Sequence, residues 1–266
     1  MCSSVFISPC WAFWQMDLPL EWWTVVSVLV KFLCVLRDET MRRRFSMSTV
    51  DERVANVVAQ LKTWGTPEDA AGMARYGVSG LEIYGVRVPQ LRKLARQLKR
   101  DHALALALWR VPARETRILA CMIADPHQAD EALLEDWVRE FNNWEVCDQC
   151  CMNLFEKTRW AWEKAMAWSY REETFVKRAG FVLMARLAVS DKKAPDERFE
   201  VFLQRVREEA GDERPMVRKA VSWALRQIGK RNPTLRKQAL ALAEELAGSS
   251  NRNARRIGKE ALRDLS

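Results

Sequence analysis

Apolar residues recur at helical spacing along most of the chain from residue 47 onward, and the alternation typical of strands is almost absent. In the segment VPQLRKLARQLKR, Leu91, Leu94, Ala95 and Leu98 fall on one face of a helix. Similar segments of about ten to sixteen residues follow one another with short connections. Prolines lie close to the starts of several segments, where a helix does not need the missing amide donor; these are Pro89, Pro112, Pro126, Pro195, Pro215 and Pro233. The pattern predicts an all-α protein.

Three of the helical segments repeat. FVKRAGFVLM begins at Phe175, MVRKAVSWAL at Met216 and NARRIGKEAL at Asn253, and each has basic residues at its third and fourth positions. RETRILACMI, from Arg114, is a weaker fourth copy. The three clear copies start about 40 residues apart, which is the period of HEAT and armadillo repeats. We therefore predict an α-solenoid of about six HEAT-like antiparallel helix pairs, curved, with one helix of each pair lining a concave face.

The charge of the chain favours an anionic partner. It has 43 Lys and Arg residues against 35 Asp and Glu, a formal net charge of +8. Equivalent positions of a solenoid fall on equivalent surfaces, so the repeated cations Arg178, Lys219 and Arg256 should form a line across a concave basic groove. A line of that kind suits a phosphate backbone. A basic but solvated surface is the alternative interpretation.

The first 46 residues differ from the rest. Leu18 to Leu36 is long enough for a membrane span, but Glu21 and Lys31 interrupt it and no basic region precedes it, as a signal peptide would require. We interpret residues 1–46 as a non-native or disordered extension, with the natural start at Met47, and a weak membrane anchor as the alternative. Residues 47–266 then form a single HEAT-like repeat domain.

The stretch FNNWEVCDQCCMNLF surrounds one carboxylate, Asp148, with Cys147, Cys150 and Cys151. A zinc site needs four ligands, and the two histidines of the chain lie in other segments. The seven cysteines show no regular spacing, so we expect reduced thiols in a cytosolic protein. We expect these three to be small core residues, without a metal or any other cofactor.

A helical wheel separates the faces of this segment. Val146, Cys147, Cys150 and Leu154 form the expected core face, with Gln149 on the opposite, solvent-facing side. Trp144, Asp148, Cys151 and Phe155 form a third stripe. As a structural residue, Asp148 would accept hydrogen bonds from an arginine or a helix N-terminus. As a functional residue, it would present an anion beside an aromatic edge to a cationic ligand or transition state. The residues alone leave both roles open.

Three motifs in order suggest a family. NNWEVCD, FVKRAGFVLMA and KAVSWALRQIGKRNP together resemble the AlkD-like DNA alkylation repair proteins, HEAT-like solenoids that act as DNA glycosylases. The resemblance runs from ARYGVSG, near Ala74, to the C-terminus, and does not cover residues 1–46. It implies that Asp148 is catalytic, that Trp144 precedes it in the cleft, and that Trp223 completes the cleft.

The same resemblance implies the DNA-binding residues. Arg178 would hold the backbone of the lesion-bearing DNA, and Tyr76 would be a further aromatic of the cleft. Lys219, Arg226 and Arg256 are additional DNA-binding candidates. The chain departs from the family pattern in a short linker region and in the cysteine-rich CDQCC setting, and members of the wider family differ in activity.

The implied function is hydrolysis of the N-glycosidic bond of cationic N3- or N7-alkylated purines in double-stranded DNA. Asp148 would stabilise the oxocarbenium-like sugar, position the attacking water, or do both. The residues leave two alternatives open: a non-catalytic HEAT-repeat DNA-binding protein and a protein-interaction scaffold. We expect a cytoplasmic monomer with no membrane contact.

Overall fold

The computed structural model describes residues 49–266, and the chain divides into two units, Met1–Asp51 and Glu52–Ser266. The second unit is described by itself below. The interpretation of residues 1–46 as a non-native extension or a weak anchor lies outside the described residues. Within residues 49–266, no helix combines the length and the apolar character needed to cross a membrane.

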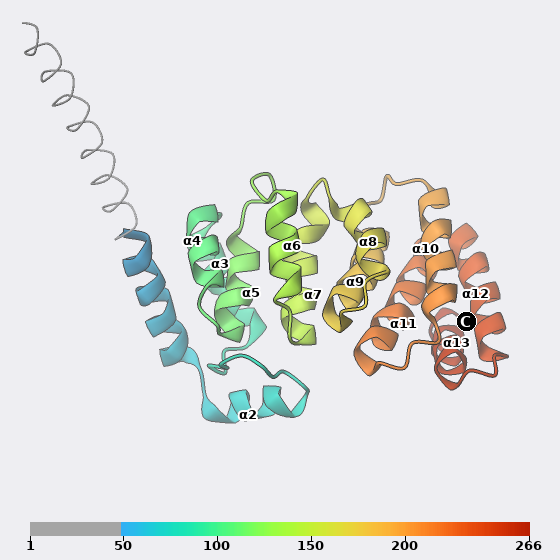
Figure 1. Ribbon diagram of the computed structural model, residues 1–266, viewed down its shortest axis with the longest axis horizontal. Coiled ribbons are helices and arrows are strands. Elements are labelled where there is room, and N and C mark those ends of the chain that lie inside the picture. Colours follow the sequence, from blue (N-terminus) through green and yellow to red (C-terminus); the bar gives the residue numbers. More distant parts are fainter. Residues whose placement is uncertain (1–48) are drawn as a thin grey trace, which may run out of the picture. The chain divides into compact units, whose positions relative to one another are not determined.

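The second unit is built from helices joined by short connections, as predicted. Helical residues continue to residue 64, and an isolated bridge between Glu82 and Ala113 is the only β-type pairing among the described residues. Figure 1 shows the later helices following one another along the unit. Their bounds are α2 (Pro67–Arg75), α3 (Val88–Leu98), α4 (His102–Trp109), α5 (Arg114–Ile123), α6 (Glu131–Arg139), α7 (Trp144–Asn153), the 3₁₀ turn η2 (Phe155–Lys157), α8 (Ala161–Ser169), α9 (Thr174–Ser190), α10 (Asp196–Glu209), α11 (Pro215–Gly229), α12 (Pro233–Ala247) and α13 (Arg252–Leu265).

The helices are arranged in two layers. One layer, called the inner layer below, consists of α5, α7, α9, α11 and α13, each of which packs on the next. Helices of the second layer pack on those of the inner layer: α4 on α5, α8 on α9 and α12 on α13. This stacking of helix pairs confirms the all-α, HEAT-like prediction. The concave basic groove stays a prediction.

Local sequence signals explain where the helices begin. Side-chain oxygens of Asp101, Asp130, Asn143, Asn232 and Asn251 accept hydrogen bonds from the first-turn amides of α4, α6, α7, α12 and α13. Such caps satisfy donors that a helix cannot satisfy itself. Proline occupies the first turn of α2, α3, α11 and α12. This confirms the expectation for Pro89, Pro215 and Pro233.

Glycine permits the closest helix contacts. A Cβ atom on Gly180 of α9 would lie 2.5 Å from the backbone nitrogen of Ser169 in α8. A Cβ on Gly258 of α13 would lie 2.4 Å from the backbone nitrogen of Ala247 in α12. The two glycines hold the same position in two copies of the repeat. Val221 holds that position in α11, whose partner α10 packs on it less extensively.

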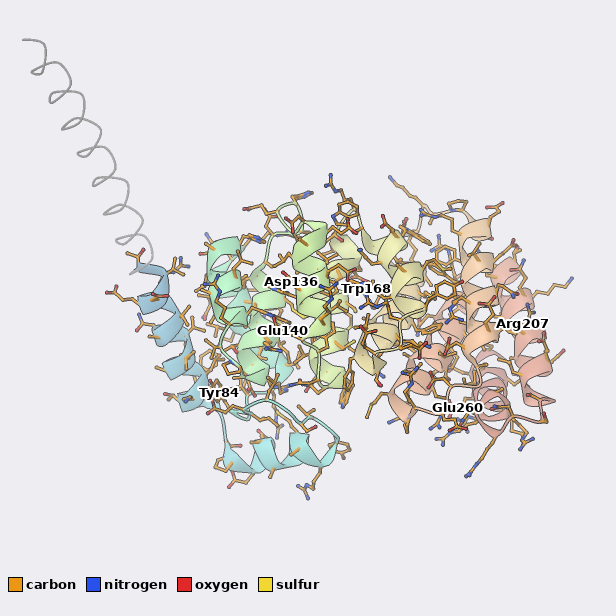
Figure 2. All side chains as sticks on the ribbon, viewed as in Figure 1. Tyr84, Asp136, Glu140, Trp168, Arg207 and Glu260 are labelled. Atoms are coloured by element: carbon orange, nitrogen blue, oxygen red, sulfur yellow. A yellow bond between two sulfur atoms is a disulfide. The ribbon has the colours of Figure 1, made fainter. Side chains whose placement is uncertain are left out.

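Aromatic side chains fill the core between the layers. The rings of Trp109 and Trp137 stack with centroids 4.1 Å apart. Trp168, labelled in Figure 2, packs edge-on against Phe155 at 5.4 Å and donates its indole N–H to Glu135 at 2.8 Å. The indoles of Trp109 and Trp168 thus bind Glu140 and Glu135, whereas the buried indole nitrogen of Trp160 has no partner within residues 49–266.

One prediction about the cysteines is wrong. Cys121 of α5 and Cys150 of α7 form a disulfide, with Cα atoms 5.1 Å apart. The pairing could not be predicted from the sequence because the two residues belong to different repeats, and only the packing of α5 on α7 brings them within disulfide range. Cys147 and Cys151 are free and buried, which confirms their predicted place in the core.

Candidate functional site

The N-terminus of α7 is fixed by two asparagines. The buried Asn143 caps the helix, with its side-chain oxygen accepting from the Val146 amide at 3.0 Å. Its neighbour Asn142 donates from Nδ2 to the carbonyl of Gly80 at 2.8 Å. These bonds set the position of the helix that carries Trp144 and Asp148.

Asp148 makes a bidentate ion pair with Arg178 of α9. Nε and Nη2 of Arg178 donate to Oδ1 and Oδ2 of Asp148 at 2.9 and 2.8 Å. The third guanidinium nitrogen, Nη1, donates to the carbonyl of Met216 in α11 at 2.6 Å. The two residues are 8% and 5% exposed. Asp148 and Arg178 therefore join three consecutive inner helices.

Burial and charge act in opposite directions on this pair. Burial raises the pKa of Asp148 above its ordinary value, and the charge and hydrogen bonds of Arg178 only partly offset that rise. The pKa of Arg178 is raised by Asp148 in spite of its own burial, so the guanidinium stays charged. Because both carboxylate oxygens accept from Arg178, the geometry is that of the ionised acid.

Trp144 and the loop after α2 lie beside this pair. The indole N–H of Trp144 donates to the carbonyl of Tyr76 at 2.9 Å, and the Tyr76 side chain is 80% exposed. Gly77 has a φ of 82°, and a Cβ there would lie 3.6 Å from the Met216 side chain. The loop therefore reaches both α7 and the start of α11, and its residue Tyr76 is exposed to solvent.

Helix α11 carries the remaining candidates along one face. Met216, Lys219, Trp223 and Arg226 follow at helical spacing. Trp223 is half-buried and Lys219 is exposed. Trp223 lies seven residues, about 10 Å of helix, beyond the Met216 carbonyl that binds Arg178. Arg226 pairs with Asp264 of α13 at 3.3 Å.

The repeated cations have different environments. Arg178 points into the protein and all three of its guanidinium nitrogens bind protein groups. Lys219 is exposed, and Arg256 is exposed but pairs with Glu260 at 3.0 Å. Arg178 therefore does not join an exposed line of cations, because Asp148 of the preceding inner helix offers a stronger partner than solvent.

Sequence reasoning missed a second ion pair on α7. Nε and Nη2 of Arg114, in α5, donate to the two oxygens of Glu145 at 2.7 Å each, and Arg114 is 1% exposed. Glu145 and Asp148 are three residues apart, so α7 carries two carboxylates that each bind an arginine of a flanking inner helix. The repeat offered no signal for it, because Arg114 holds the first position of its copy, where the other copies have Phe175, Met216 and Asn253.

Neighbouring Glu115 extends this network to the segment before α3. Its carboxylate accepts from the amides of Tyr84, Gly85 and Val86 at 3.0 to 3.2 Å. Arg114 and Glu115 therefore connect that segment to α7. Neither here nor in any other part of residues 49–266 do three or more His, Cys, Asp or Glu side chains come together so that they could hold a metal ion.

Comparison with known proteins gives one family. The family model of the DNA alkylation repair enzymes matches residues 57–265. Among curated protein sequences none matches the chain. A solved structure described as a new family of proteins related to the HEAT-like repeat DNA glycosylases, with affinity for branched DNA structures, superposes with a TM-score of 0.67 at 18% identity. The match covers 79% of this chain and 94% of that one, and it shows the HEAT-like fold.

A second solved structure, an engineered protein, reaches a TM-score of only 0.35 at 15% identity. That match covers 66% of this chain and 90% of the other. It adds nothing to the assignment of the fold.

Proposed function

Since the chain belongs to the DNA alkylation repair enzyme family, we propose that it is a DNA glycosylase. Its substrate would be duplex DNA with cationic N3- or N7-alkylated purines, and its reaction the hydrolysis of their N-glycosidic bond. One observation carries the proposal: a nearly buried carboxylate, Asp148, is held at both oxygens by Arg178, one helical turn after Trp144, whose indole binds the backbone carbonyl of the exposed Tyr76.

The chemistry asks little of the protein besides an oriented anion. An alkylated purine already carries a positive charge, so it departs with the electron pair of the C1′–N bond and becomes neutral. Positive charge then develops on the deoxyribose, where a fixed carboxylate stabilises it. Water adds its oxygen to C1′ and releases a proton to solvent.

Asp148 keeps the capacity for this role despite its ion pair. Each of its oxygens accepts one N–H from Arg178, which leaves a further acceptor site on each oxygen. One of these sites could hold the attacking water, while the negative charge faces the sugar. Trp144 and Trp223 would add cation–π attraction of about 0.5–2 kcal/mol for the cationic base.

We assign Arg178 the role of positioning Asp148. Its guanidinium spends three of its five N–H donors on Asp148 and Met216, and the residue is only 5% exposed, so little of it is open to a phosphate. The proposed contacts to the DNA backbone fall to the more accessible cations Lys219, Arg226 and Arg256.

A non-catalytic DNA-binding protein is the second candidate. It is favoured by the same ion pair, because Arg178 compensates the charge of Asp148, and by the affinity for branched DNA of the structurally similar protein. In that case Asp148 would hold three helices together and take no part in chemistry.

Release of 7-methylguanine from methylated duplex DNA by the full chain tests the proposal. We expect base release in single turnover that exceeds spontaneous depurination, with no metal or cofactor added. Tight binding of linear or four-way-junction DNA without base release would support the second candidate instead. Absence of both binding and release would refute both and favour a protein-interaction scaffold.

A further inference from the structure

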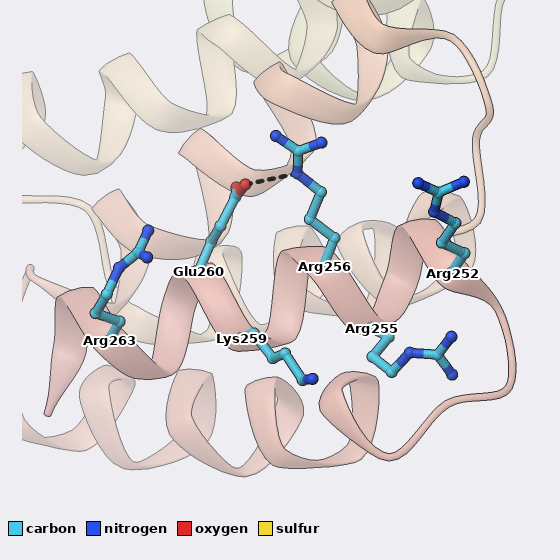
Figure 3. Close-up of a pocket in the computed structure, with 6 residues that line it drawn as sticks. All are labelled: Arg252, Arg255, Arg256, Lys259, Glu260 and Arg263. Atoms are coloured by element: carbon cyan, nitrogen blue, oxygen red, sulfur yellow. Dashed lines mark hydrogen bonds and ion pairs between the residues drawn. The ribbon is translucent and has the colours of Figure 1, made fainter.

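The C-terminal helix α13 has a strongly basic exposed face. Five cations surround a shallow hollow there, and Glu260 is the only other residue lining it (Figure 3). On a helical wheel these cations fall within an arc of about 100°. That arc is centred opposite the buried residues of the helix, which include Ala254, Ile257 and Ala261. The cations are Arg252, Arg255, Arg256, Lys259 and Arg263.

Most of these charges have no internal counter-ion. Arg252, Lys259 and Arg263 form no ion pair within the described residues, and Arg255 donates only to a backbone carbonyl, that of Ser249. Arg256 is the exception, because it pairs with Glu260.

The acids of α13 are engaged on its other side. Glu260 also accepts from Ser222 of α11 at 2.9 Å, and Asp264 binds Arg226 of α11 and Lys230, the residue that caps the C-terminus of α11. The acids therefore serve the packing of α13 on α11 and compensate only Arg256 on the cationic face.

Stability does not explain this arrangement. The first turn of α13 contains no acidic residue, and cations near a helix N-terminus oppose the helix dipole. Like charges three and four residues apart also repel one another, as Arg252, Arg256 and Lys259 do here. The last helix of a solenoid needs a polar outer face, but that need is met by mixed charges as well as by a single sign.

The shape of the cationic face suits a linear polyanion. Arg252 and Arg263 are eleven residues apart, which corresponds to about 16 Å of helix. About five base pairs of duplex DNA have the same length along the duplex axis. The face is open and lined by charged groups, so it offers little to an apolar ligand.

We propose that this face of α13 binds the phosphate backbone of duplex DNA outside the Asp148 site. The inference rests on DNA being the ligand, as proposed above, but does not require base excision. Helices α7, α9, α11 and α13 pack in series. At about 8–10 Å per step, α13 lies up to about 30 Å from α7, a length of eight or nine base pairs. The α13 contacts therefore fall on one side of the base at Asp148.

The test compares two triple variants of the full chain. The first, Arg252→Gln, Lys259→Gln and Arg263→Gln, removes the unpaired charges of α13. The matched control, Lys192→Gln, Lys193→Gln and Lys237→Gln, removes three exposed charges elsewhere. Binding to a 40-base-pair duplex with one central lesion is measured by anisotropy between 50 and 200 mM salt.

We expect the α13 variant to lower the salt slope by about 2.7, close to one unit per lost phosphate contact. Its affinity deficit against the wild type would then be about 40-fold larger at 50 mM than at 200 mM salt. The control should keep the wild-type slope. Hydroxyl-radical footprints of the α13 variant should lose protection on one side of the lesion only.

An unchanged slope and footprint for the α13 variant, or equal losses in the two variants, would overturn the inference. Each result is separable from the glycosylase proposal. A wild type that releases no base can still show the α13-dependent slope. An active enzyme with an unchanged slope in the α13 variant would refute only the α13 site.

Discussion

Replacing Arg178 with methionine tests the central ion pair of the fold. The change keeps a long unbranched side chain and removes the guanidinium, which is 5% exposed and binds both Asp148 and Met216. Removing one partner of a buried pair leaves the other charge uncompensated, at a cost of about 3–5 kcal/mol. We therefore expect the free energy of unfolding to fall by about that amount at pH 7.

The effect should depend on pH in a defined direction. Burial already raises the pKa of Asp148, and loss of Arg178 should raise it further. In the variant, the folded state then holds a proton on Asp148 in a pH range where the unfolded chain has lost it. The unfolded chains of the two proteins titrate alike, so the variant's deficit should grow with pH between the two folded-state pKa values of Asp148: the wild-type value, which burial raises above 3.8, and the higher value of the variant.

A double-mutant cycle isolates the pair. In an Asp148→Asn background the buried charge of Arg178 is already uncompensated, so Arg178→Met removes that charge as well as its hydrogen bonds and should cost far less than in the wild type. Urea unfolding followed by circular dichroism, at pH 7 and at pH 4.5, measures all four proteins. An Arg178→Met cost below 1 kcal/mol, unaffected by pH and by the Asp148 background, would refute the buried ion pair.

Four further expectations follow from single contacts. Trp144→Phe removes the N–H bond to Tyr76, so excision at sub-saturating DNA should fall several-fold; an unchanged kcat/KM would show that the loop position does not matter. Gly180→Ala places a Cβ 2.5 Å from the backbone of α8, so thermal unfolding should report a loss of about 1–3 kcal/mol; an unchanged Tm would contradict that close approach. The bonds of Glu135 to Lys164 and Trp168 lower its pKa below 4.5 in spite of burial, so Glu135→Gln should destabilise by about 1–3 kcal/mol at pH 7, and this loss should shrink as the pH falls below 4.5 through the lowered folded-state pKa; a loss that does not shrink on acidification would refute the ionic contribution. The excision rate should fall on acidification with a midpoint above pH 3.8, because burial raises the pKa of Asp148; a rate independent of pH down to 3.8 would show that ionised Asp148 is not required.

Much of the fold could be predicted from local patterns. Helical periodicity identified the buried faces of α3, where Leu91 and Leu94 are buried, and of α7, where Val146 and Cys150 are buried. The prediction that Gln149 faces solvent is wrong, since it is only 8% exposed. The helical-wheel prediction assumes that a helix buries only one face, whereas α7 packs against both α5 and α9.

The partners within the site could not be predicted in the same way. Asp148 binds Arg178 thirty residues later, and Arg114 binds Glu145 at nearly the same separation. That separation depends on the lengths of the intervening helix and turns, which hydrophobic periodicity defines only to within a few residues. The residue types of the site were recognisable, but the role of Arg178 as an internal partner of Asp148 required the packing of α7 on α9.

The most direct test of the central proposal compares Asp148→Asn with Glu145→Gln in single-turnover release of 7-methylguanine. Both changes neutralise a carboxylate of α7 that binds an arginine of a flanking helix at both oxygens, so their structural costs are matched. Only Asp148 is proposed to face the sugar. We expect the rate at saturating DNA to fall about 10²–10³-fold in Asp148→Asn and to stay within a few-fold of the wild type in Glu145→Gln, with the Kd for DNA little changed in both. Equal rates in the two variants, whether both high or both low, would contradict a catalytic role for Asp148.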